Sequence, residues 1–428
     1  MTEAAGERSL RVVRIIDRLI YGGPTRNVVF LTEGLSKLGF ECHLITGIPA
    51  TGESDMAAWA LQYQVEPHRI PEMSRELCAR DALVVVKLWR LFKKLRPDII
   101  HTHKSKAGAT GRIAAFLYRY CTFSTLLGRP RRVQVLHTFH GHIFHSYYGR
   151  LKTAFFVQIE RLLARMTDCI VTVSRQQEHE IRDVYGVGRT TEFRVVPLGV
   201  DFSASHSGNK FRQTHGISPE EFLIAAVGRL CEVKNFPLLL QAMALARKAA
   251  PSRPMRLAFI GDGHLRAELE EEARQLGISE AVIFAGICDD VDAIYREVDL
   301  AALSSLNEGT PLVLIEAMGQ GKAVVMTEVG GYQDILGELL STEKGFKVWR
   351  HGVSVGSGDL QGYASALAFL HANPELRQQM GEAGRGYSWQ RFSRKRLVED
   401  MAGLYRELSS TRRSKGTISE AAPRHSLG

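Results

Sequence analysis

Two glutamates, Glu308 and Glu316, stand eight residues apart in the run Glu-Gly-Thr-Pro-Leu-Val-Leu-Ile-Glu. At about 3.6 residues per turn they lie roughly 80° apart around a helix, so both can border one pocket. Thr310 suits the N-cap of that helix and Pro311 its first position. The amides that open the helix lack acceptors within it and can bind an anion. Because carboxylates accept sugar hydroxyls well, the segment predicts a pocket in which a ribose or hexose ligand uses both glutamates.

The alternative for this segment is an ordinary capped helix with Glu316 on a solvated face. The apolar residues around Glu316, from 312 to 318, argue against that alternative. A second segment, residues 227–235, follows an expected strand and carries Arg229 and Lys234. Arginine can grip a diphosphate through its fork and lysine as a point charge. A solvated surface pair remains the alternative there.

Two further segments carry weaker signals. Gly22 and Gly23 form a turn after the first expected strand, where glycine lets a ligand approach the backbone. Four histidines fall within residues 137–145, but no Asp or Glu occurs between residues 98 and 160, which argues against zinc. No metal site is therefore predicted. Of these histidines, His140 at the end of a strand is the candidate for a hydrogen-bonding or acid–base group.

The elements that must position these residues alternate between β-branched strands and helices, which predicts parallel sheets covered by helices. The expected strands are 11–17, 42–46, 98–101, 132–137, 168–173, 193–197, 222–227, 256–260, 282–285, 300–303 and 323–327. The expected fold is α/β, with two doubly wound Rossmann-like domains that face each other across a cleft. Their ligands are expected beyond the carboxyl ends of the strands.

Domain boundaries follow from the polar, non-periodic stretch 201–218. The prediction is an N-terminal domain at 1–200, a linker at 201–218, a C-terminal domain at 219–390, a returning helix at 391–408 and a disordered tail at 409–428.

The net charge of +9 is unevenly spread along the 428 residues. Residues 1–200 carry 29 Lys+Arg against 18 Asp+Glu, whereas residues 201–408 carry 22 against 27. Without aromatic–basic alternation or a base-reading module, nucleic-acid binding is not expected. Six scattered cysteines suit reduced thiols in the cytoplasm. No apolar run reaches the length of a membrane span or a signal peptide.

Taken together, the segments resemble glycosyltransferase family 4, whose members are retaining, nucleotide-sugar-dependent enzymes of the GT-B fold. The resemblance covers about residues 11–408. It is carried by the Glu-x7-Glu motif at 308–316, Val-Gly-Arg-Leu at 227–230 with Lys234, Ile-Gly-Asp-Gly at 260–263, Val-Gly-Gly at 329–331, and Pro-Asp-Ile-Ile-His-Thr-His at 97–103. One departure is Asn235, where many members have glycine, and we expect it to have little effect.

The resemblance implies roles for individual residues. The implied catalytic residues are His140, beside the transferred sugar, and Glu308, in contact with the donor sugar. The implied donor-binding residues are Gly22, Gly23, Arg229, Lys234, Ile287, Gly309, Thr310, Pro311, Leu312 and Glu316. Arg229 and Lys234 would bind the diphosphate, Glu316 the ribose, and Ile287 would lie near the base. No cofactor is implied.

The expected function is a metal-independent, retaining hexosyltransferase. It would move a sugar from a UDP- or GDP-linked donor to a glycan or lipid-linked acceptor in bacterial surface-polysaccharide synthesis. The alternatives are a sugar-nucleotide epimerase of the same fold and a non-catalytic scaffold for envelope assembly. Residues 87–96 form a basic amphipathic helix, either an ordinary solvated helix or a face that rests on an anionic membrane. The expected location is cytoplasmic, at the inner face of the membrane.

Overall fold

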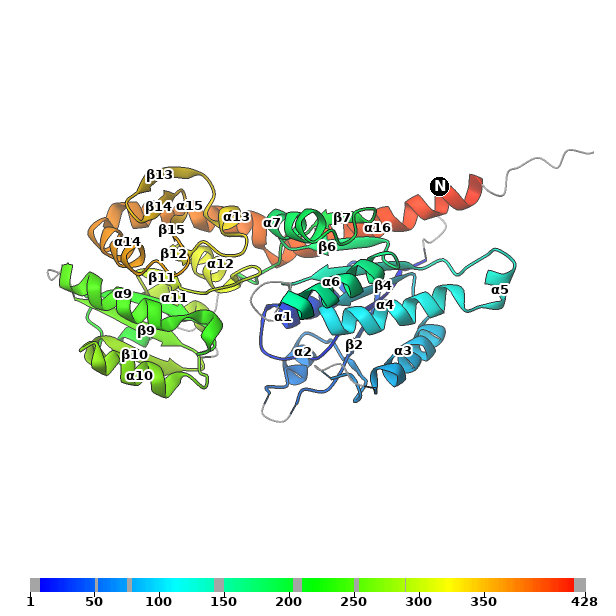
Figure 1. The fold of residues 1–428 in the computed structure, drawn as a ribbon, viewed down its shortest axis with the longest axis horizontal. Coiled ribbons are helices and arrows are strands. Elements are labelled where there is room, and N and C mark those ends of the chain that lie inside the picture. The colour runs from blue at the N-terminus through cyan, green and yellow to red at the C-terminus, as the bar shows by residue number, and fades with distance from the viewer. Residues whose placement is uncertain are drawn as a thin grey trace, which may run out of the picture. The chain divides into compact units, whose positions relative to one another are not determined.

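The fold was analysed in a computed structural model, which describes residues 8–50, 53–74, 79–141, 150–202, 210–249, 254–288 and 290–418. The chain forms two compact units, each built on its own sheet (Figure 1). Unit 1 comprises Met1–Val173, Gln177–Leu198 and Lys395–Gly428, and unit 2 comprises Ser174–Gln176 and Gly199–Arg394.

Unit 1 contains a seven-stranded sheet in the order β3-β2-β1-β4-β5-β6-β7. Every neighbouring pair in it is parallel. The strands are β1 (Arg11–Ile16), β2 (Glu41–Thr46), β3 (His68–Arg69), β4 (Ile99–His103), β5 (Gln134–Phe139), β6 (Cys169–Thr172) and β7 (Glu192–Val195). Strands β4, β5 and β6 are buried along their whole length, as expected for a parallel sheet covered on both faces.

Helices cover both faces of this sheet. They are α1 (Gly23–Lys37), α2 (Ala57–Gln62), α3 (Asp81–Leu95), α4 (Ser105–Tyr120), α5 (Phe123–Leu126), α6 (Arg150–Ala164), α7 (Arg175–His179) with a π-helical turn at Glu180–Val184, and α16 (Arg394–Ile418). Side chains of α3 and α4 share one core with β1 and β4, and those of α1 and α16 share another. The last helix is therefore an integral part of unit 1.

Unit 2 contains an eight-stranded sheet in the order β10-β9-β8-β11-β12-β15-β14-β13. Its strands are β8 (Phe222–Val227), β9 (Met255–Ile260), β10 (Val282–Gly286), β11 (Leu300–Leu303), β12 (Ala323–Thr327), β13 (Leu339–Glu343), β14 (Phe346–Trp349) and β15 (Gly352–Val355). The first six in the spatial order are parallel, and β14 and β13 are antiparallel.

The helices of unit 2 divide between two hydrophobic cores. Helices α9 (Phe236–Ala249), α10 (Arg266–Gln275) and α14 (Leu360–Ala372) contribute to one. Helices α8 (Phe211–Thr214), α11 (Val291–Glu297), α12 (Leu312–Gly319) and α13 (Tyr332–Leu336) contribute to the other, and α15 (Pro374–Phe392) reaches both. Short 3-10 turns lie at Glu232–Lys234 and Ser279–Ala281. None of the helices in the described ranges is long and apolar enough to cross a bilayer.

Both sheets reverse their direction of winding at one point. In unit 1 the chain leaves β1 toward β2 on one side and later returns to place β4 on the other side. In unit 2 the same reversal separates β8 from β11. Loops that follow two such strands diverge and leave a crevice at the carboxyl edge, where doubly wound sheets bind ligands. The segments after β1 and β4 and after β8 and β11 are therefore the places to search for function.

The expected α/β fold with two Rossmann-like domains is confirmed, and most expected strands agree with the structure to within two residues. Strands β3 and β13–β15 were not predicted, and helices α4 and α14 are among the helices that were missed. Part of the expected linker 201–218 instead belongs to unit 2, because Phe211 and Ile217 are buried in its core. The expected disordered tail, 409–428, begins as helix to Ile418. A helix already docked through its first turns adds one hydrogen bond per further residue, so polar residues can continue it.

Helix α16 gives a matched pair of stability predictions. Met401 is buried against unit 1, whereas Gly403 faces open space two residues later. Met401→Ala should lower the free energy of unfolding by about 2–5 kcal/mol, because it leaves a cavity. Gly403→Ala should raise it by up to about 1 kcal/mol, because alanine favours helix. Equilibrium urea unfolding measures both; equal effects of the same sign would contradict this docking of α16.

Candidate functional site

The loops after β8 and β11 in unit 2 are joined by a short network of polar contacts. Lys234 Nζ lies 2.6 Å from Glu308 Oε1, and both side chains are mostly buried. Ser305 Oγ donates to the same carboxylate oxygen at 2.7 Å. Ser304 Oγ donates to the carbonyl of Lys234 at 2.8 Å. Lys234 and Glu308, which the sequence placed 74 residues apart in one site, are therefore in direct contact.

The glycine motif after β12 packs against the same loop. A Cβ on Gly330, whose φ is +59°, would lie 2.7 Å from the carbonyl oxygen of Glu308 and 2.9 Å from that of Gly309. Thr327 Oγ1 donates to the carbonyl of Ser305 at 2.6 Å, which fixes the other end of the loop. Backbone contact at Gly330 excludes a larger residue, so the loop is held from two directions before any ligand binds.

The start of α12 corrects the expected cap. The N-cap is Pro311 rather than Thr310, and the helix begins at Leu312, because Pro311 has the non-helical ψ of 81°. The amide of Leu312 is not open either, since it donates to the carbonyl of Thr310 at 2.9 Å. The buried hydroxyl of Thr310 has no hydrogen-bond partner among the residues that the structure describes. Among the described residues the amides of Gly309 and Thr310 donate no backbone hydrogen bond, so these two groups remain to bind an anion.

The other donor-site candidates of unit 2 occupy the same edge of its sheet. Glu316 is 8% exposed, so the solvated-face alternative is wrong. Arg229 is exposed just after β8, with no ion-pair partner among the described residues. Ile287, after β10, is 76% exposed although it is a large apolar side chain. Asn235 has φ 47° and ψ 45°, a left-handed conformation that asparagine tolerates better than most residues, which agrees with the small effect expected there.

At the carboxyl edge of unit 1, Gly22 and Gly23 open helix α1. Gly22 is the N-cap, with φ +149°, and the amide of Arg26 donates to its carbonyl at 3.3 Å. A Cβ on Gly22 would meet nothing closer than Pro24 Cδ at 3.8 Å, so the space over this turn is open to a ligand.

His140 belongs to a column of histidines in unit 1. Its Nε2 lies 3.0 Å from Nδ1 of His103, and the two rings are stacked with centroids 5.2 Å apart. The ring of His103 in turn lies 4.3 Å from that of His101, whose Nδ1 is 2.6 Å from Tyr405 Oη. His137 Nδ1 is bonded instead to Thr102 Oγ1 at 2.9 Å. No group of three His, Cys, Asp or Glu side chains in the described ranges is arranged to hold a metal ion.

Burial keeps these histidines neutral. Burial lowers the pKa of His101, His103 and His137 well below 6.5, and neighbouring cationic groups lower it further. Burial, then the charge of Lys104, lowers the pKa of His140 to about 3. His140 is therefore a neutral hydrogen-bonding group at pH 7 rather than a strong proton acceptor. Its Nδ1 is buried and has no hydrogen-bond partner among the described residues.

Lys104 is a site candidate that the sequence analysis missed. It follows β4 directly and has φ 64° and ψ 162°, a conformation that non-glycine residues rarely adopt and that clusters at functional sites. Its Nζ lies 3.0 Å from Asp17 Oδ1, at the end of β1. The signal in the sequence was a lysine directly after the strand that ends in His-Thr-His. This ion pair links the ends of β1 and β4. We call the place where the winding of a sheet reverses, here between β1 and β4, its switch point.

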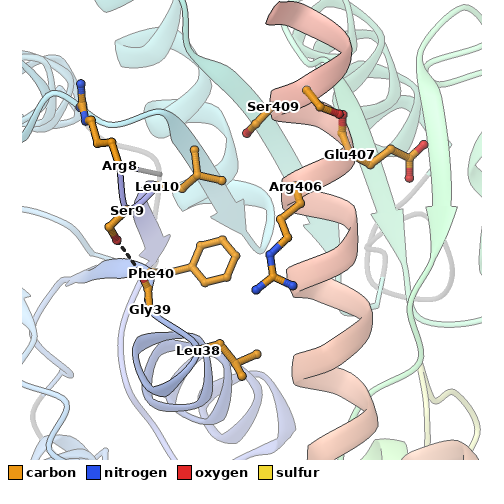
Figure 2. Close-up of a pocket in the computed structure, with 10 residues that line it drawn as sticks. Arg8, Ser9, Leu10, Leu38, Gly39, Phe40, Arg406, Glu407 and Ser409 are labelled. Atoms are coloured by element: carbon orange, nitrogen blue, oxygen red, sulfur yellow. Dashed lines mark hydrogen bonds between the residues drawn. The ribbon is translucent and has the colours of Figure 1, made fainter. Parts of the chain in front are cut away.

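A hollow of 420 Å³ lies elsewhere on unit 1 (Figure 2). It is lined by Leu10 and Phe40, which directly precede β1 and β2, and by Arg406 of α16. The Arg406 guanidinium lies 5.3 Å from the centre of the Phe40 ring. The hollow is therefore at the amino edge of the sheet, opposite the edge that carries Gly22 and His140, and it contains none of the predicted site residues.

Two family models match the chain, and together they cover most of it. One, described as Glycosyltransferase Family 4, matches residues 21–204, and the other, Glycosyl transferases group 1, matches residues 208–387. The chain belongs to glycosyltransferase family 4, and its fold is GT-B.

Relatives of known name agree with this assignment. A putative glycosyltransferase, EpsD, of Bacillus subtilis is 26% identical over 86% of this chain and 90% of its own. A UDP-Gal:alpha-D-GlcNAc-diphosphoundecaprenol alpha-1,3-galactosyltransferase of Escherichia coli is 28% identical over 61% of this chain and 66% of its own. Among solved structures, HepE of Anabaena in complex with UDP-glucose superposes with a TM-score of 0.73 at 18% identity. That match covers 93% of this chain and 100% of HepE.

The lowered histidine pKa values predict acid sensitivity. Below about pH 6.5 the unfolded chain binds protons at these histidines while the folded chain does not, so the free energy of unfolding falls as the pH drops from 6.5 to 5. His103→Asn should reduce the slope of that fall, measured by urea unfolding at several pH values. The matched control is His264→Gln, an exposed histidine of unit 2. An unchanged slope in His103→Asn would show that the column titrates normally.

Proposed function

We propose that the protein is a retaining glycosyltransferase that moves a hexosyl group from a nucleotide-sugar donor to a glycan or lipid-linked acceptor. The observation that carries the proposal is the contact of Lys234 with Glu308 at the switch point of unit 2. It sits beside two open amides and a buried, unpartnered hydroxyl. A cation, amide donors and carboxylates in one place match a ligand that combines phosphate with sugar hydroxyls.

In this proposal each group of unit 2 binds a distinct part of the donor. Arg229 and Lys234 bind the diphosphate, with the amides of Gly309 and Thr310 completing the anion site. Glu308 accepts hydroxyls of the donor sugar, and Glu316 those of the ribose. Pro311 and Leu312 shape the backbone that presents these amides, and exposed Ile287 covers one side of the base.

Unit 1 contributes groups for the sugar and the phosphates. Gly22 and Gly23 let the donor phosphates approach the backbone, as their open space permits. His140, neutral at pH 7, hydrogen-bonds the transferred sugar. Asp17 and Lys104 hold β1 and β4 together beside these groups. The proposed role of His140 is therefore orientation, not proton abstraction.

The reaction follows from where charge develops. The bond between the sugar's anomeric carbon and the diphosphate oxygen breaks, and the leaving diphosphate gains negative charge. Arg229 and Lys234 stabilise that charge without the aid of a metal ion. The acceptor oxygen bonds to the anomeric carbon on the face the phosphate leaves, and its proton passes to the departing phosphate oxygen. We propose retention by this same-face route rather than through attack by Glu308, because the Glu308 carboxylate is already engaged by Lys234 and Ser305.

The relatives indicate which donors and acceptors to test first. The galactosyltransferase of Escherichia coli is named for a UDP-linked donor and a diphosphoundecaprenol acceptor, and HepE was solved with UDP-glucose. We therefore propose a UDP-sugar donor, with GDP-sugars as the alternative, and a lipid-linked acceptor in bacterial surface-polysaccharide synthesis. With such an acceptor, the proposed location is the cytoplasm, at the inner face of the membrane.

Loss of either donor-site cation tests the proposal. Arg229→Ala and Lys234→Ala should each lower the turnover rate by about 100-fold or more, because each removes preorganised stabilisation of the leaving group. Release of nucleoside diphosphate from a panel of UDP- and GDP-sugars measures the rate. Lys344→Ala, at an exposed lysine between β13 and β14, is the control. Turnover near that of the wild type in both variants would refute the donor-site assignment.

Thr310 allows a prediction in which donor affinity falls while the stability of the protein does not. Its hydroxyl is buried and unpartnered, so Thr310→Val removes an unsatisfied group and should leave the free energy of unfolding unchanged or slightly raised. Donor affinity should fall by roughly tenfold, the effect of about one hydrogen bond to a charged group. Calorimetric titration with nucleoside diphosphate measures affinity, and Thr310→Ser should retain it. If the Thr310→Val variant bound nucleoside diphosphate as tightly as the wild type does, this hydroxyl would not belong to the site.

Two other functions remain as alternatives. A sugar-nucleotide epimerase of the same fold would convert the donor when no acceptor is present, and chromatography of the sugar nucleotide detects that product. A non-catalytic envelope scaffold would not bind nucleotide sugars at all. The intact set Arg229, Lys234, Glu308 and Glu316 favours the transferase over the scaffold.

A further inference from the structure

Large apolar side chains line the outer side of α4 and continue through α5. Ile113, Phe116 and Tyr120 follow each other on one side of α4 at helical spacing, and all three are exposed. Phe123, Leu126 and Leu127 extend this stripe, with 79%, 82% and 68% of their surfaces exposed. We call these six residues the apolar ridge. Proteins rarely expose so many large apolar groups in sequence unless another surface covers them.

The fold of unit 1 does not require the ridge. Helix α4 packs on the sheet through its other side, with Ala107, Ala114 and Ala115 buried in the core. Helix α5 buries none of its residues, and its start is held only locally, by Thr122 Oγ1 accepting from the amide of Thr125 at 3.3 Å. The aromatic and leucine side chains of α5 therefore contribute little to the core of the unit.

Exposed basic residues follow the ridge in the sequence and lie on the neighbouring helix α3. Residues 99–159 contain nine Lys+Arg and no Asp or Glu, although four of these cations form ion pairs with acidic side chains from elsewhere in the chain. Arg129 and Arg132, just after the ridge, are exposed, and the Arg131 guanidinium lies 4.6 Å from the centre of the Tyr118 ring. Helix α3, which packs beside α4, adds the exposed Arg90 and Lys94.

The basic helix at 87–96 is therefore only part of this surface. Lys87 is engaged by Glu72, with Nζ 2.6 Å from Oε1, and Lys93 Nζ lies 3.8 Å from the centre of the Trp89 ring. Buried Val84, Leu88 and Phe92 turn the helix's apolar side inward. Helix α3 supplies charge and exposes only Leu83 and Val86 among its large apolar side chains, whereas the ridge exposes six such groups.

We propose that the apolar ridge is a membrane-docking surface, in which Phe123, Leu126 and Leu127 insert below the headgroups of an anionic bilayer. The surrounding arginines and lysines would contact lipid phosphates. A second copy of the chain is a poorer occupant, because a two-fold contact through this face would bring the exposed cations Arg129 and Arg132 of both copies together. The inference gives the proposed membrane location a specific surface. Vesicle binding needs no donor or acceptor, so its test is separate from that of the transferase.

The test is co-sedimentation of the full chain with vesicles of phosphatidylcholine, with and without 30% phosphatidylglycerol, at low and high salt. The wild type should bind the anionic vesicles and release at high salt. A triple variant, Phe123→Ser with Leu126→Ser and Leu127→Ser, should bind about tenfold more weakly or worse, since its apolar anchor is lost. Charge reversal by Arg129→Glu with Arg132→Glu should weaken binding at low salt by a similar factor.

Matched controls come from unit 2. Leu339→Ser with Leu340→Ser removes two exposed leucines of β13, and Lys344→Glu with Arg350→Glu reverses two exposed cations. Both should bind as the wild type does, and thermal unfolding should show all variants folded. No binding by the wild type, or equal binding by the ridge variant, would overturn the proposal. So would a concentration-dependent dimer in sedimentation velocity that the ridge variant abolishes, since a second copy would then cover the ridge.

Discussion

The arrangement depends on one constraint, the reversal of winding direction in each parallel sheet. At that point two neighbouring strands end at the same edge while their loops diverge, so side chains far apart in sequence must meet there. In unit 2 the loops after β8 and β11 meet as Lys234 and Glu308, 2.6 Å apart. In unit 1 the ends of β1 and β4 meet as Asp17 and Lys104, 3.0 Å apart. Each switch point is thus closed by one ion pair.

The ion pair of unit 2 positions two side chains for a ligand and contributes little to the stability of the fold. Both side chains are mostly buried, so removing water from them offsets much of their attraction. The attraction also fixes the ammonium and the carboxylate before a ligand arrives. Ser305 and the close contact at Gly330 hold the carboxylate and its loop in the same way. In unit 1, burial performs the corresponding task by keeping the histidine column neutral and hydrogen-bonded.

Sequence patterns predicted the fold well because buried parallel strands are short apolar runs bounded by turn residues. They failed where the local pattern was ambiguous. Helix α4 contains many small residues and was not recognised, although its packing on the sheet requires them at Gly108 and Gly111. Thr310 has the chemistry of an N-cap, yet the backbone angle of Pro311 delays the helix by one residue. The position of Lys104 directly after a strand was a weak signal, because its importance lies in a backbone conformation and a partner 87 residues earlier, which only tertiary structure reveals.

The most direct test of the central claim is a crystal structure of the protein with a bound nucleoside diphosphate. The account predicts phosphate oxygens within hydrogen-bonding distance of Lys234 Nζ and of the amides of Gly309 and Thr310, with the ribose hydroxyls on Glu316. A diphosphate bound away from the carboxyl edge of the unit 2 sheet, for example in the hollow beside Phe40 and Arg406, would contradict it.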